Sequence, residues 1–233
     1  MLSIIIPTLN EEKNLSLLLS SLKEEKGDWE IIIADAGSTD KTLKVAEDFG
    51  CIITEGGLPA EGRNKGALKA RGDIFLFLDA DLKLSPRFAK NSLEEFKARN
   101  LAVASFALLP IKNNFYLNPL TLNLFYNFPQ RILQKVFPLG AMGIMVKRDI
   151  FEKVKGFDPS IKLSEDHCFI QAAAKLGKFG IIRSAKIYMP ARRFEKDGYW
   201  QTAFKYLLCG LHMMFLGPVR SDKFNYQFGH YDK

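Results

Sequence analysis

Two aspartates separated by one alanine follow a run of five apolar residues in the stretch 74-IFLFLDADLKLSP-86. A spacing of two places Asp79 and Asp81 on the same side of an extended segment. There they could share a hard divalent cation, or divide between a cation and a ribose hydroxyl. A third acid, Asp35, ends another apolar run, 29-WEIIIAD-35. All three could instead be turn or pre-helix acids, which are common after strands.

The elements around these acids alternate between apolar strands and helices with leucines at helical spacing. No hairpin signal joins neighbouring strands, so we predict an α/β fold with a doubly wound, mostly parallel sheet flanked by helices. Ligands of such a sheet bind beyond the carboxyl ends of its strands, where the three acids should gather. Strands are expected at 2–6, 29–35, 51–54 and 73–78, and helices at 11–25, 40–49 and 60–70.

The second half of the chain is less regular. Ser85 is expected to cap a helix that Pro86 opens, and Ser164 to cap a helix that Gly177 closes. The segment 110–139 is rich in aromatic residues, Asn and Pro and has no clear period. Further strands are expected at 101–109, 143–146 and, as short pieces, near 179–189, with helices at 86–99, 165–176 and 199–216.

Size and cysteine content indicate one domain in a reducing compartment. The chain has 233 residues, of which 47% are hydrophobic, enough to bury one substantial core. Cys51, Cys168 and Cys209 are odd in number and stand at no metal-ligand spacing, which indicates buried thiols. The first residues lack the basic and long apolar regions of a signal peptide and are interpreted as a strand. These features predict a cytoplasmic protein.

The net charge of +7 is concentrated in one region. No Asp or Glu lies between Phe96 and Arg148, which favours nucleic acid, anionic lipid or a phosphorylated substrate as partner. Nucleic acid explains it least well, because the positive residues are widely spaced in an apolar segment without a nucleic-acid motif. The positive residues are Lys97, Arg99, Lys112, Arg131, Lys135, Lys147 and Arg148.

Two acids open the helix predicted at 165–176. The helix dipole favours the ionised form of Asp166 by a few tenths to about 1 kcal/mol, so its carboxylate could accept a proton from a hydroxyl. The same position has a plainer explanation, because Glu165 and Asp166 are the residues that a stable helix start carries. His167, next to them, is interpreted as an ordinary polar residue.

Five segments, in this order and at these intervals, resemble the family 2 glycosyltransferases of the GT-A fold over about residues 2–190. The resemblance implies a nucleotide-sugar donor across residues 1–100 and an acceptor half at 101–190. It also implies a D-x-D element that binds ribose and a Mg or Mn ion, and an Asp of an E-D pair as base for an inverting transfer. Residues 191–233 would add a basic loop and an apolar amphipathic helix. The segments are 3–12, 31–42, 63–86, 140–158 and 164–169.

The resemblance assigns roles to individual residues. Asp166 would be the catalytic base, with Glu165 supporting the site or the cap. Asp81, ahead of Asp79, would be the direct metal ligand. Ala36 departs from the pattern, because many relatives have an Asp there that recognises the nucleotide base. The identity of the donor therefore stays open. The residues matched to the donor site are Pro7, Thr8, Asn10, Glu11, Asp35, Arg63, Asn64, Gly66, Asp79, Ala80 and Asp81.

Basic residues on either side of the D-x-D element suit a charged leaving group. A diphosphate develops negative charge as the sugar bond breaks, and Arg63 and Lys65 could stabilise it beside the cation. Lys65 could equally be a solvated helix charge. Arg192 and Arg193 could form a loop that closes over the diphosphate with forked donors, or a solvated basic loop. His212 is a further candidate for the metal shell, because some GT-A enzymes add a late histidine.

Two apolar segments, 115–137 and 203–218, bear on membranes. Neither should span a bilayer, because spanning takes about 20 apolar residues and both are interrupted by Pro, Asn, Lys or His. Flanked by Lys112, Arg131 and Lys135, they could lie on anionic lipid at the inner face of the membrane, which makes polyprenyl phosphates or glycolipids candidate acceptors. Alternatively, they pack on the sheet or form a dimer interface.

Other classes of function stay in competition with a glycosyltransferase. A non-catalytic module that binds a nucleotide sugar or a lipid surface could keep the same fold, and Ala36 is its one hint. A lipid-phosphate acceptor, unlike a hydroxyl, would hardly need a base, because it is ionised near neutral pH. A nicotinamide oxidoreductase is disfavoured, because no G-x-G-x-x-G follows the first strand, and a sugar nucleotidyltransferase lacks its Gly-rich loop at the same place.

Overall fold

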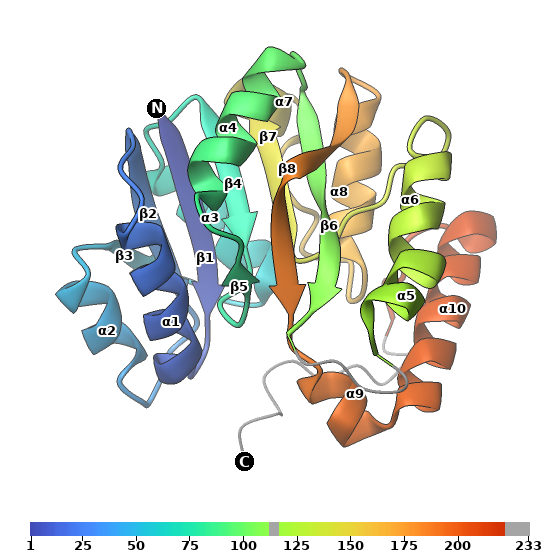
Figure 1. Ribbon diagram of the computed structural model, residues 1–233, viewed down its shortest axis with the longest axis horizontal. Helices are drawn as coiled ribbons and strands as arrows, with labels where there is room; N and C mark the ends of the chain where they lie inside the picture. The colour runs from blue at the N-terminus through green and yellow to red at the C-terminus, as the bar shows by residue number, and fades with distance from the viewer. Residues whose placement is uncertain (112–116, 222–233) are drawn as a thin grey trace.

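The computed structural model describes residues 1–111 and 117–221. In this part of the chain an eight-stranded sheet has the order β3-β2-β1-β4-β7-β6-β8-β5, with helices on both faces (Figure 1). The strands are β1 (Leu2–Thr8), β2 (Trp29–Asp35), β3 (Ile52–Glu55), β4 (Ile74–Leu78), β5 (Lys83–Leu84), β6 (Val103–Pro110), β7 (Gly143–Lys147) and β8 (Phe179–Met189). The longer helices of the sheet are α1 (Glu12–Lys23), α2 (Thr42–Asp48), α3 (Pro59–Lys69), α4 (Phe88–Ala98), α7 (Arg148–Val154) and α8 (Glu165–Ala174).

The predicted doubly wound, mostly parallel sheet is confirmed. Strands β1 to β4 run parallel, and β6 pairs with β8 in parallel. Strand β7 runs antiparallel between β4 and β6, and the two-residue β5 pairs antiparallel with β8. The expected short strands near 179–189 are one strand, β8, with a register shift opposite Phe106 and Ala107.

Strand β1 is buried on both faces, which explains its unbroken apolar sequence. Ile4 and Ile6 pack in the core formed with α1, whereas Ile5 packs with α3 and α7 on the other face. A Cβ on Gly66 would lie 2.4 Å from Cγ2 of Ile5, so only glycine lets α3 approach the strand this closely. Gly66 thereby sets the distance between α3 and β1.

Two predicted helix boundaries are wrong, whereas α8 begins at Glu165, directly after Ser164, as predicted. Helix α4 begins at Phe88, and Ser85 instead accepts a hydrogen bond from the Lys186 amide (3.0 Å) at the edge of β8. Ser164 has a left-handed backbone (φ +62°) and does not cap α8 through its side chain. Its hydroxyl lies 3.3 Å from Sγ of Cys209. Helix α8 ends at Ala174, before Gly177. The hydroxyls of Ser85 and Ser164 thus make tertiary contacts in place of side-chain caps.

The aromatic region without a clear period folds as three short helical pieces. These are α5 (Pro119–Leu122), a π-helical turn η1 (Asn123–Asn127) and α6 (Phe128–Leu133). Buried Asn127 anchors them to the sheet, because its amide exchanges two hydrogen bonds of 2.9 Å with the backbone of Leu108. Two further helices follow β8, namely α9 (Arg192–Asp197) and α10 (Tyr199–Leu216). Residues 190–200, expected as a loop, therefore contain α9.

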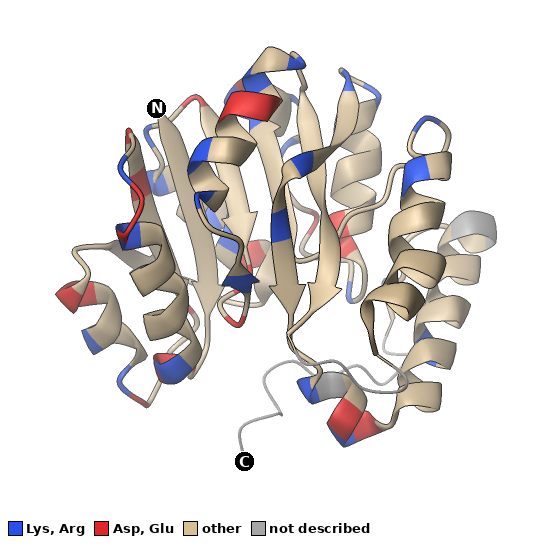
Figure 2. Cartoon of the chain, in the orientation of Figure 1, with Lys and Arg blue, Asp and Glu red and all other residues tan. Residues whose placement is uncertain are grey.

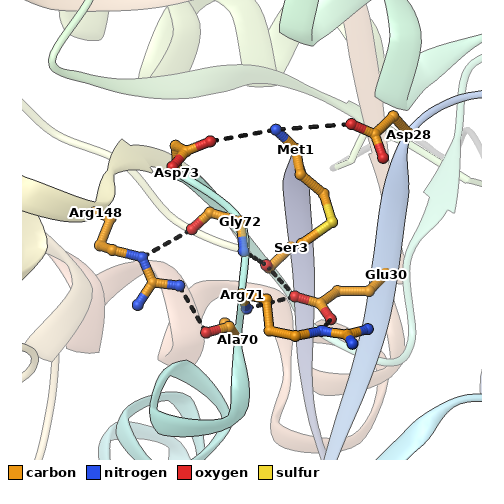
Figure 3. A network of polar contacts seen from close by, with 9 residues as sticks. All are labelled: Met1, Ser3, Asp28, Glu30, Ala70, Arg71, Gly72, Asp73 and Arg148. Carbon is orange, nitrogen blue, oxygen red and sulfur yellow. Dashed lines mark hydrogen bonds and ion pairs between the residues drawn. The ribbon is translucent and has the colours of Figure 1, made fainter.

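The amino ends of β1, β2 and β4 are fixed by a polar network around Glu30 (Figure 3). Its carboxylate accepts hydrogen bonds from the Ser3 hydroxyl (2.7 Å), the Arg71 amide (2.5 Å) and Nε of Arg71 (2.8 Å). Arg148 adds hydrogen bonds to the carbonyl oxygens of Gly72 and Ala70. This network leaves the opposite, carboxyl ends of the strands for a site.

The predicted absence of a spanning segment is borne out for the residues that are described. Among them, no helix combines the length and the apolar character needed to cross a membrane. The predicted segment 115–137 begins with two residues that lie outside the described part of the chain.

Candidate active site

The loops after β1 and β2 form one rigid wall at the carboxyl ends of the strands. Asp35 stands beside Thr8 in the parallel register, and the Thr8 hydroxyl donates to its carboxylate (3.0 Å). The same carboxylate accepts hydrogen bonds from the Gly37 amide (3.0 Å), the Ser38 amide (2.8 Å) and the Ser38 hydroxyl (2.6 Å). Asp35 is 6% exposed, so it organises the turn after β2.

Asn10 joins the two loops from the other side. Its backbone is left-handed (φ +56°), its side-chain oxygen accepts a hydrogen bond from the Thr39 amide (2.8 Å), and its own amide donates to the Ser38 hydroxyl (2.8 Å). Pro7 pairs with Ala34 within the sheet. The predicted donor residues of β1 and β2 are thus brought together and held in place by the backbone of the neighbouring loop.

Arg63 of α3 links the two acidic motifs. Its Nη1 lies 2.6 Å from Oε1 of Glu165 and its Nη2 lies 3.0 Å from Oδ1 of Asp79. The guanidinium also covers the ring of Phe157 at 5.2 Å, and the arginine is 5% exposed. The carboxylates of Asp79 and Glu165 raise the pKa of Arg63 although burial opposes this. A fixed positive charge therefore holds the start of α8 against the end of β4.

Asn64 ties the same helix to the turn after α7. Its side-chain oxygen accepts a hydrogen bond from the Phe157 amide (2.9 Å), and its side-chain nitrogen donates to the Phe157 carbonyl (2.8 Å). Phe157 was not among the predicted site residues, although it stands in the segment 140–158 on which the family resemblance depends. Within α3, Arg63 and Asn64 therefore make contacts inside the protein that position the acids.

Asp79 and Asp81 do not lie on the extended segment expected from their spacing. The chain turns after β4, and Ala80 is buried in the turn. Asp79 pairs with Arg63, whereas Oδ2 of Asp81 lies 2.7 Å from Nη2 of Arg192. The same nitrogen of Arg192 lies 3.1 Å from Oε1 of Glu11. The two carboxylates of the D-x-D element are thus held by arginines from distant parts of the chain.

Crowding of acids changes their protonation. Burial raises the pKa of Asp79 to about 6; the carboxylates of Asp81 and Asp166 add to this increase, and Arg63 opposes it. Burial also raises the pKa of Glu11, against hydrogen bonds from Asn14 and Arg192. The mutual repulsion of the carboxylates makes this end of the sheet attractive to a cation.

Asp166 lies at the junction between the acidic cluster and the η1 turn. Its carboxylate raises the pKa of both Asp79 and Tyr126, and burial raises the pKa of Tyr126 still more strongly. Oδ1 of Asp166 accepts a hydrogen bond from the amide of His167 (2.8 Å). Nδ1 of His167 accepts one from the amide of Gly140 (3.2 Å), so the neutral ring carries its proton on Nε2.

Tyr126 is a second residue that sequence reasoning missed. It lies in a segment without periodicity, and no motif marks it. Its hydroxyl oxygen is inaccessible to solvent, and the raised pKa keeps it protonated. A neutral hydroxyl on a π-helical turn beside Asp166 is an arrangement found at functional sites more often than elsewhere.

The side chains present fit a hard divalent cation by their chemistry. Carboxylate oxygens, such as those of Asp79, Asp81 and Glu11, are the donors that Mg²⁺ and Mn²⁺ prefer. Among the described residues no three His, Cys, Asp or Glu side chains are gathered as a ready metal site. Nδ1 of His212, the further candidate for the metal shell, lies 3.0 Å from the carbonyl oxygen of Gly217. The side chain of Arg193 is outside the described set.

Comparison with protein families identifies the chain. The model of glycosyl transferase family 2 matches residues 3–155, so the chain belongs to this family. A 90-residue segment is 34% identical to poly(ribitol-phosphate) beta-N-acetylglucosaminyltransferase TarS of Staphylococcus aureus, and covers 34% of this chain and 16% of TarS. An uncharacterized glycosyltransferase of Haemophilus influenzae is 28% identical over 183 residues, which are 73% of this chain and 60% of the relative. The chain thus spans only part of the length of these relatives.

Solved structures share the fold and so confirm the GT-A architecture. S. aureus TarS in complex with UDP-GlcNAc has a TM-score of 0.65 at 20% identity, over 81% of this chain and 58% of that one. The mannosyltransferase PcManGT from Pyrobaculum calidifontis, in complex with GDP-Man and Mn²⁺, has a TM-score of 0.67 at 18% identity. That match covers 89% of this chain and 61% of the other.

Proposed function

We propose that the protein transfers a sugar, with inversion, from a nucleotide-sugar donor to a hydroxyl or lipid-phosphate acceptor, with the help of Mg²⁺ or Mn²⁺. The observation that carries this proposal is the joining of the D-x-D and E-D motifs through Arg63, with Asp166 close enough to Asp79 for its charge to raise the pKa of Asp79. The nucleotide sugars in the two related structures support the donor class, and the Mn²⁺ in the PcManGT complex supports the cofactor.

The wall formed by the loops after β1 and β2 would receive the nucleoside. Thr8, Asn10 and Asp35 are fixed by hydrogen bonds, so they would bind a ligand at little cost in conformational entropy. Ala36 offers no polar side chain to a nucleotide base, and its backbone amide donates a hydrogen bond to the Thr8 carbonyl oxygen (2.9 Å). We therefore expect contacts from the ribose and the diphosphate to contribute more than recognition of the base.

Asp81, with Asp79 beside it, would hold the divalent cation, which when bound supplies positive charge to the diphosphate leaving group. Asp166 would take the proton from an acceptor hydroxyl while the oxygen of that hydroxyl bonds to the anomeric carbon. As this bond forms, the bond from the anomeric carbon to the diphosphate breaks on the opposite face, which gives inversion. Arg63 and Glu165 position the two acidic motifs relative to each other.

We also propose that the protein touches an anionic membrane. The helices α5, α6 and α10 lie at the β6 side of the molecule in Figure 1. They expose large apolar side chains, with Phe125 77% and Trp200 76% exposed, and we propose that these form one apolar face. Figure 2 shows blue but no red on α6 and α10. Positive charge beside exposed aromatics suits anionic lipid. The apolar face comprises Leu120, Leu124, Phe125, Phe128 and Ile132 of α5 to α6, and Trp200, Phe204, Leu207 and Leu211 of α10.

The membrane contact is tested with phosphatidylglycerol and phosphatidylcholine vesicles at low salt. The variant with Phe125→Ser and Phe204→Ser should lose binding to the anionic vesicles, whereas Leu17→Ser, an exposed leucine on α1, should keep it. Equal binding by both variants, or no binding by the wild type, contradicts this part of the proposal. A dimer that Phe125→Ser and Phe204→Ser dissolve would assign the face to a second copy instead.

The transfer itself is tested by donor binding and donor hydrolysis. UDP- and GDP-sugars should raise the unfolding temperature in the presence of Mn²⁺, since a ligand at 100 times its dissociation constant adds about 2.7 kcal/mol of stability. Asp81→Asn should abolish the Mn²⁺-dependent part of this shift. Stabilisation without any turnover, in hydrolysis or in transfer, would favour a non-catalytic binding module.

A further inference from the structure

One nitrogen of Arg192 bridges two carboxylates that come from different loops. Nη2 lies 2.7 Å from Oδ2 of Asp81, in the turn after β4, and 3.1 Å from Oε1 of Glu11, in the loop after β1. The other oxygen of Glu11 accepts a hydrogen bond from Asn14 (2.6 Å). Arg192 therefore supplies positive charge at the oxygen atoms toward which a divalent cation would be drawn.

The two arginines of the site are anchored very differently. Arg63 is carried by an 11-residue helix packed on β1, its side chain is 7% exposed, and Phe157 lies against its guanidinium. The Arg192 side chain is 25% exposed and belongs to the six-residue α9. Arg63 is thus enclosed by the core, whereas the side chain of Arg192 is more accessible to solvent and to ligands.

Helix α9 is attached to α10. The ring of Phe194 lies 5.8 Å from that of Tyr199 and 6.2 Å from that of Tyr206. Gly198, with φ of +87°, separates the two helices. Phe194 and Tyr199 also pack against the large core that β1 and β4 share, so α9 is anchored there, and the ion pairs of Arg192 add contacts to the loops after β1 and β4.

A guanidinium and a divalent cation cannot both contact the same oxygen of Asp81, because their charges repel at that distance. We propose that Arg192 is an internal counter-ion that holds Asp81 and Glu11 until the cation displaces it; this rests on the cation site of the proposed function. The released guanidinium, still carried by α9, then binds the diphosphate of the donor, for which its forked donors are suited.

This arrangement has a thermodynamic signature. The cation must break the Arg192 ion pairs, so the arginine weakens cation binding in the absence of a nucleotide. A nucleoside diphosphate provides the released arginine with a new partner, so nucleotide and cation strengthen each other's binding beyond their direct contact. Such reciprocal coupling commonly amounts to about 5–150-fold in affinity.

The experiment measures Mn²⁺ binding directly, by the loss of the electron paramagnetic resonance signal of free Mn²⁺, with and without UDP or GDP. Arg192→Gln should bind Mn²⁺ alone about tenfold more tightly than the wild type, and should lose most of the coupling to the nucleotide. Arg192→Lys, which keeps a charge but not the fork, should fall between the two. Arg71→Gln, which removes an arginine–carboxylate pair at the opposite ends of the strands, should change neither quantity.

The possible outcomes distinguish a failure of the role of Arg192 from a failure of the cation site itself. Unchanged or weaker Mn²⁺ binding by Arg192→Gln, with Asp81→Asn still abolishing binding, overturns the role of Arg192 and leaves the cation site intact. A wild-type protein that binds no Mn²⁺ with or without nucleotide overturns the cation site, and the inference with it.

Discussion

The Arg63 linkage gives the sharpest quantitative prediction about this fold. Replacing Arg63 by Met keeps an unbranched apolar stem but removes the positive charge between Glu165 and Asp79, and the Glu165 side chain is only 10% exposed. Breaking a buried ion pair by removing one partner costs about 3–5 kcal/mol, because the remaining charge is left uncompensated. The loss of the guanidinium over Phe157 adds about 0.5–2 kcal/mol.

The total of about 3.5–7 kcal/mol from these two contributions is an upper bound, because the surrounding structure and water can relax around the site of the lost charge. A loss of 3–5 kcal/mol is therefore expected in Arg63→Met, out of a total stability of about 5–15 kcal/mol. Glu165→Gln should cost less, about 1.5–3 kcal/mol, because the amide oxygen still accepts a hydrogen bond from Nη1. Urea unfolding followed by circular dichroism measures both values.

The double variant, with Arg63→Met and Glu165→Gln, tests the cause of the loss. If the cost comes from an unpaired buried carboxylate, removing that carboxylate should recover part of it, with an interaction energy of about 1–3 kcal/mol. Lys44→Met, which breaks an exposed ion pair with Asp48, should leave the unfolding midpoint unchanged. Strictly additive losses, or a loss below about 1 kcal/mol in Arg63→Met, would refute the linkage.

Three further predictions concern single residues. Asp166→Asn should lower kcat about 10²–10⁴-fold with a hydroxyl acceptor while donor binding is kept; full activity would indicate a phosphate acceptor or another base. Burial raises the pKa of Asp79 to about 6 from an ordinary 3.8, so the folded protein binds the proton of this carboxyl group more tightly than the unfolded chain does. The stability that the protonated group contributes is therefore lost as pH rises from about 4 to 6. The unfolding free energy of the wild type relative to Asp79→Asn should accordingly fall over that range, and a rise would contradict the assignment. Gly66→Ala should destabilise by up to about 2 kcal/mol in urea unfolding, because overpacking against Ile5 (about 1–3 kcal/mol) opposes the gain in helix propensity (about 1 kcal/mol); a more stable variant would contradict the close approach.

Local patterns predict the first half of the molecule well, because β1, β2 and β4 are largely buried on both faces and α1 presents a single apolar stripe of leucines. The runs at 29–35 and 74–78 read directly as β2 and β4, and the acids that end them fall at the carboxyl edge of the sheet. The order of the strands is then constrained by right-handed crossovers. Position at this edge is thus a property that sequence alone can provide.

The partners of the acids could not be predicted in the same way. Arg192 is separated from Asp81 by 111 residues, and Arg63 from Glu165 by 102, so no local pattern joins them. Capping was misjudged for a related reason. Ser85 and Ser164 carry hydroxyls that satisfy a cap, yet in the fold these hydroxyls contact Lys186 and Cys209. Propensity describes what a residue can do, and packing selects which partner it receives.

The two arginines divide the site into a rigid part and an exchangeable part. The buried ion pairs among Glu165, Arg63 and Asp79 fix α8, the helix of the proposed base Asp166, to the end of β4. No step of the proposed transfer requires these ion pairs to open. The ion pairs among Glu11, Arg192 and Asp81 are more exposed, and they must open before a cation can bind. Preorganisation stabilises a transition state only where the groups stay fixed during the reaction. The rigid ion pairs of Arg63 therefore suit the part of the site where the new bond forms, whereas the exchangeable ion pairs of Arg192 suit the entry and release of the charged donor.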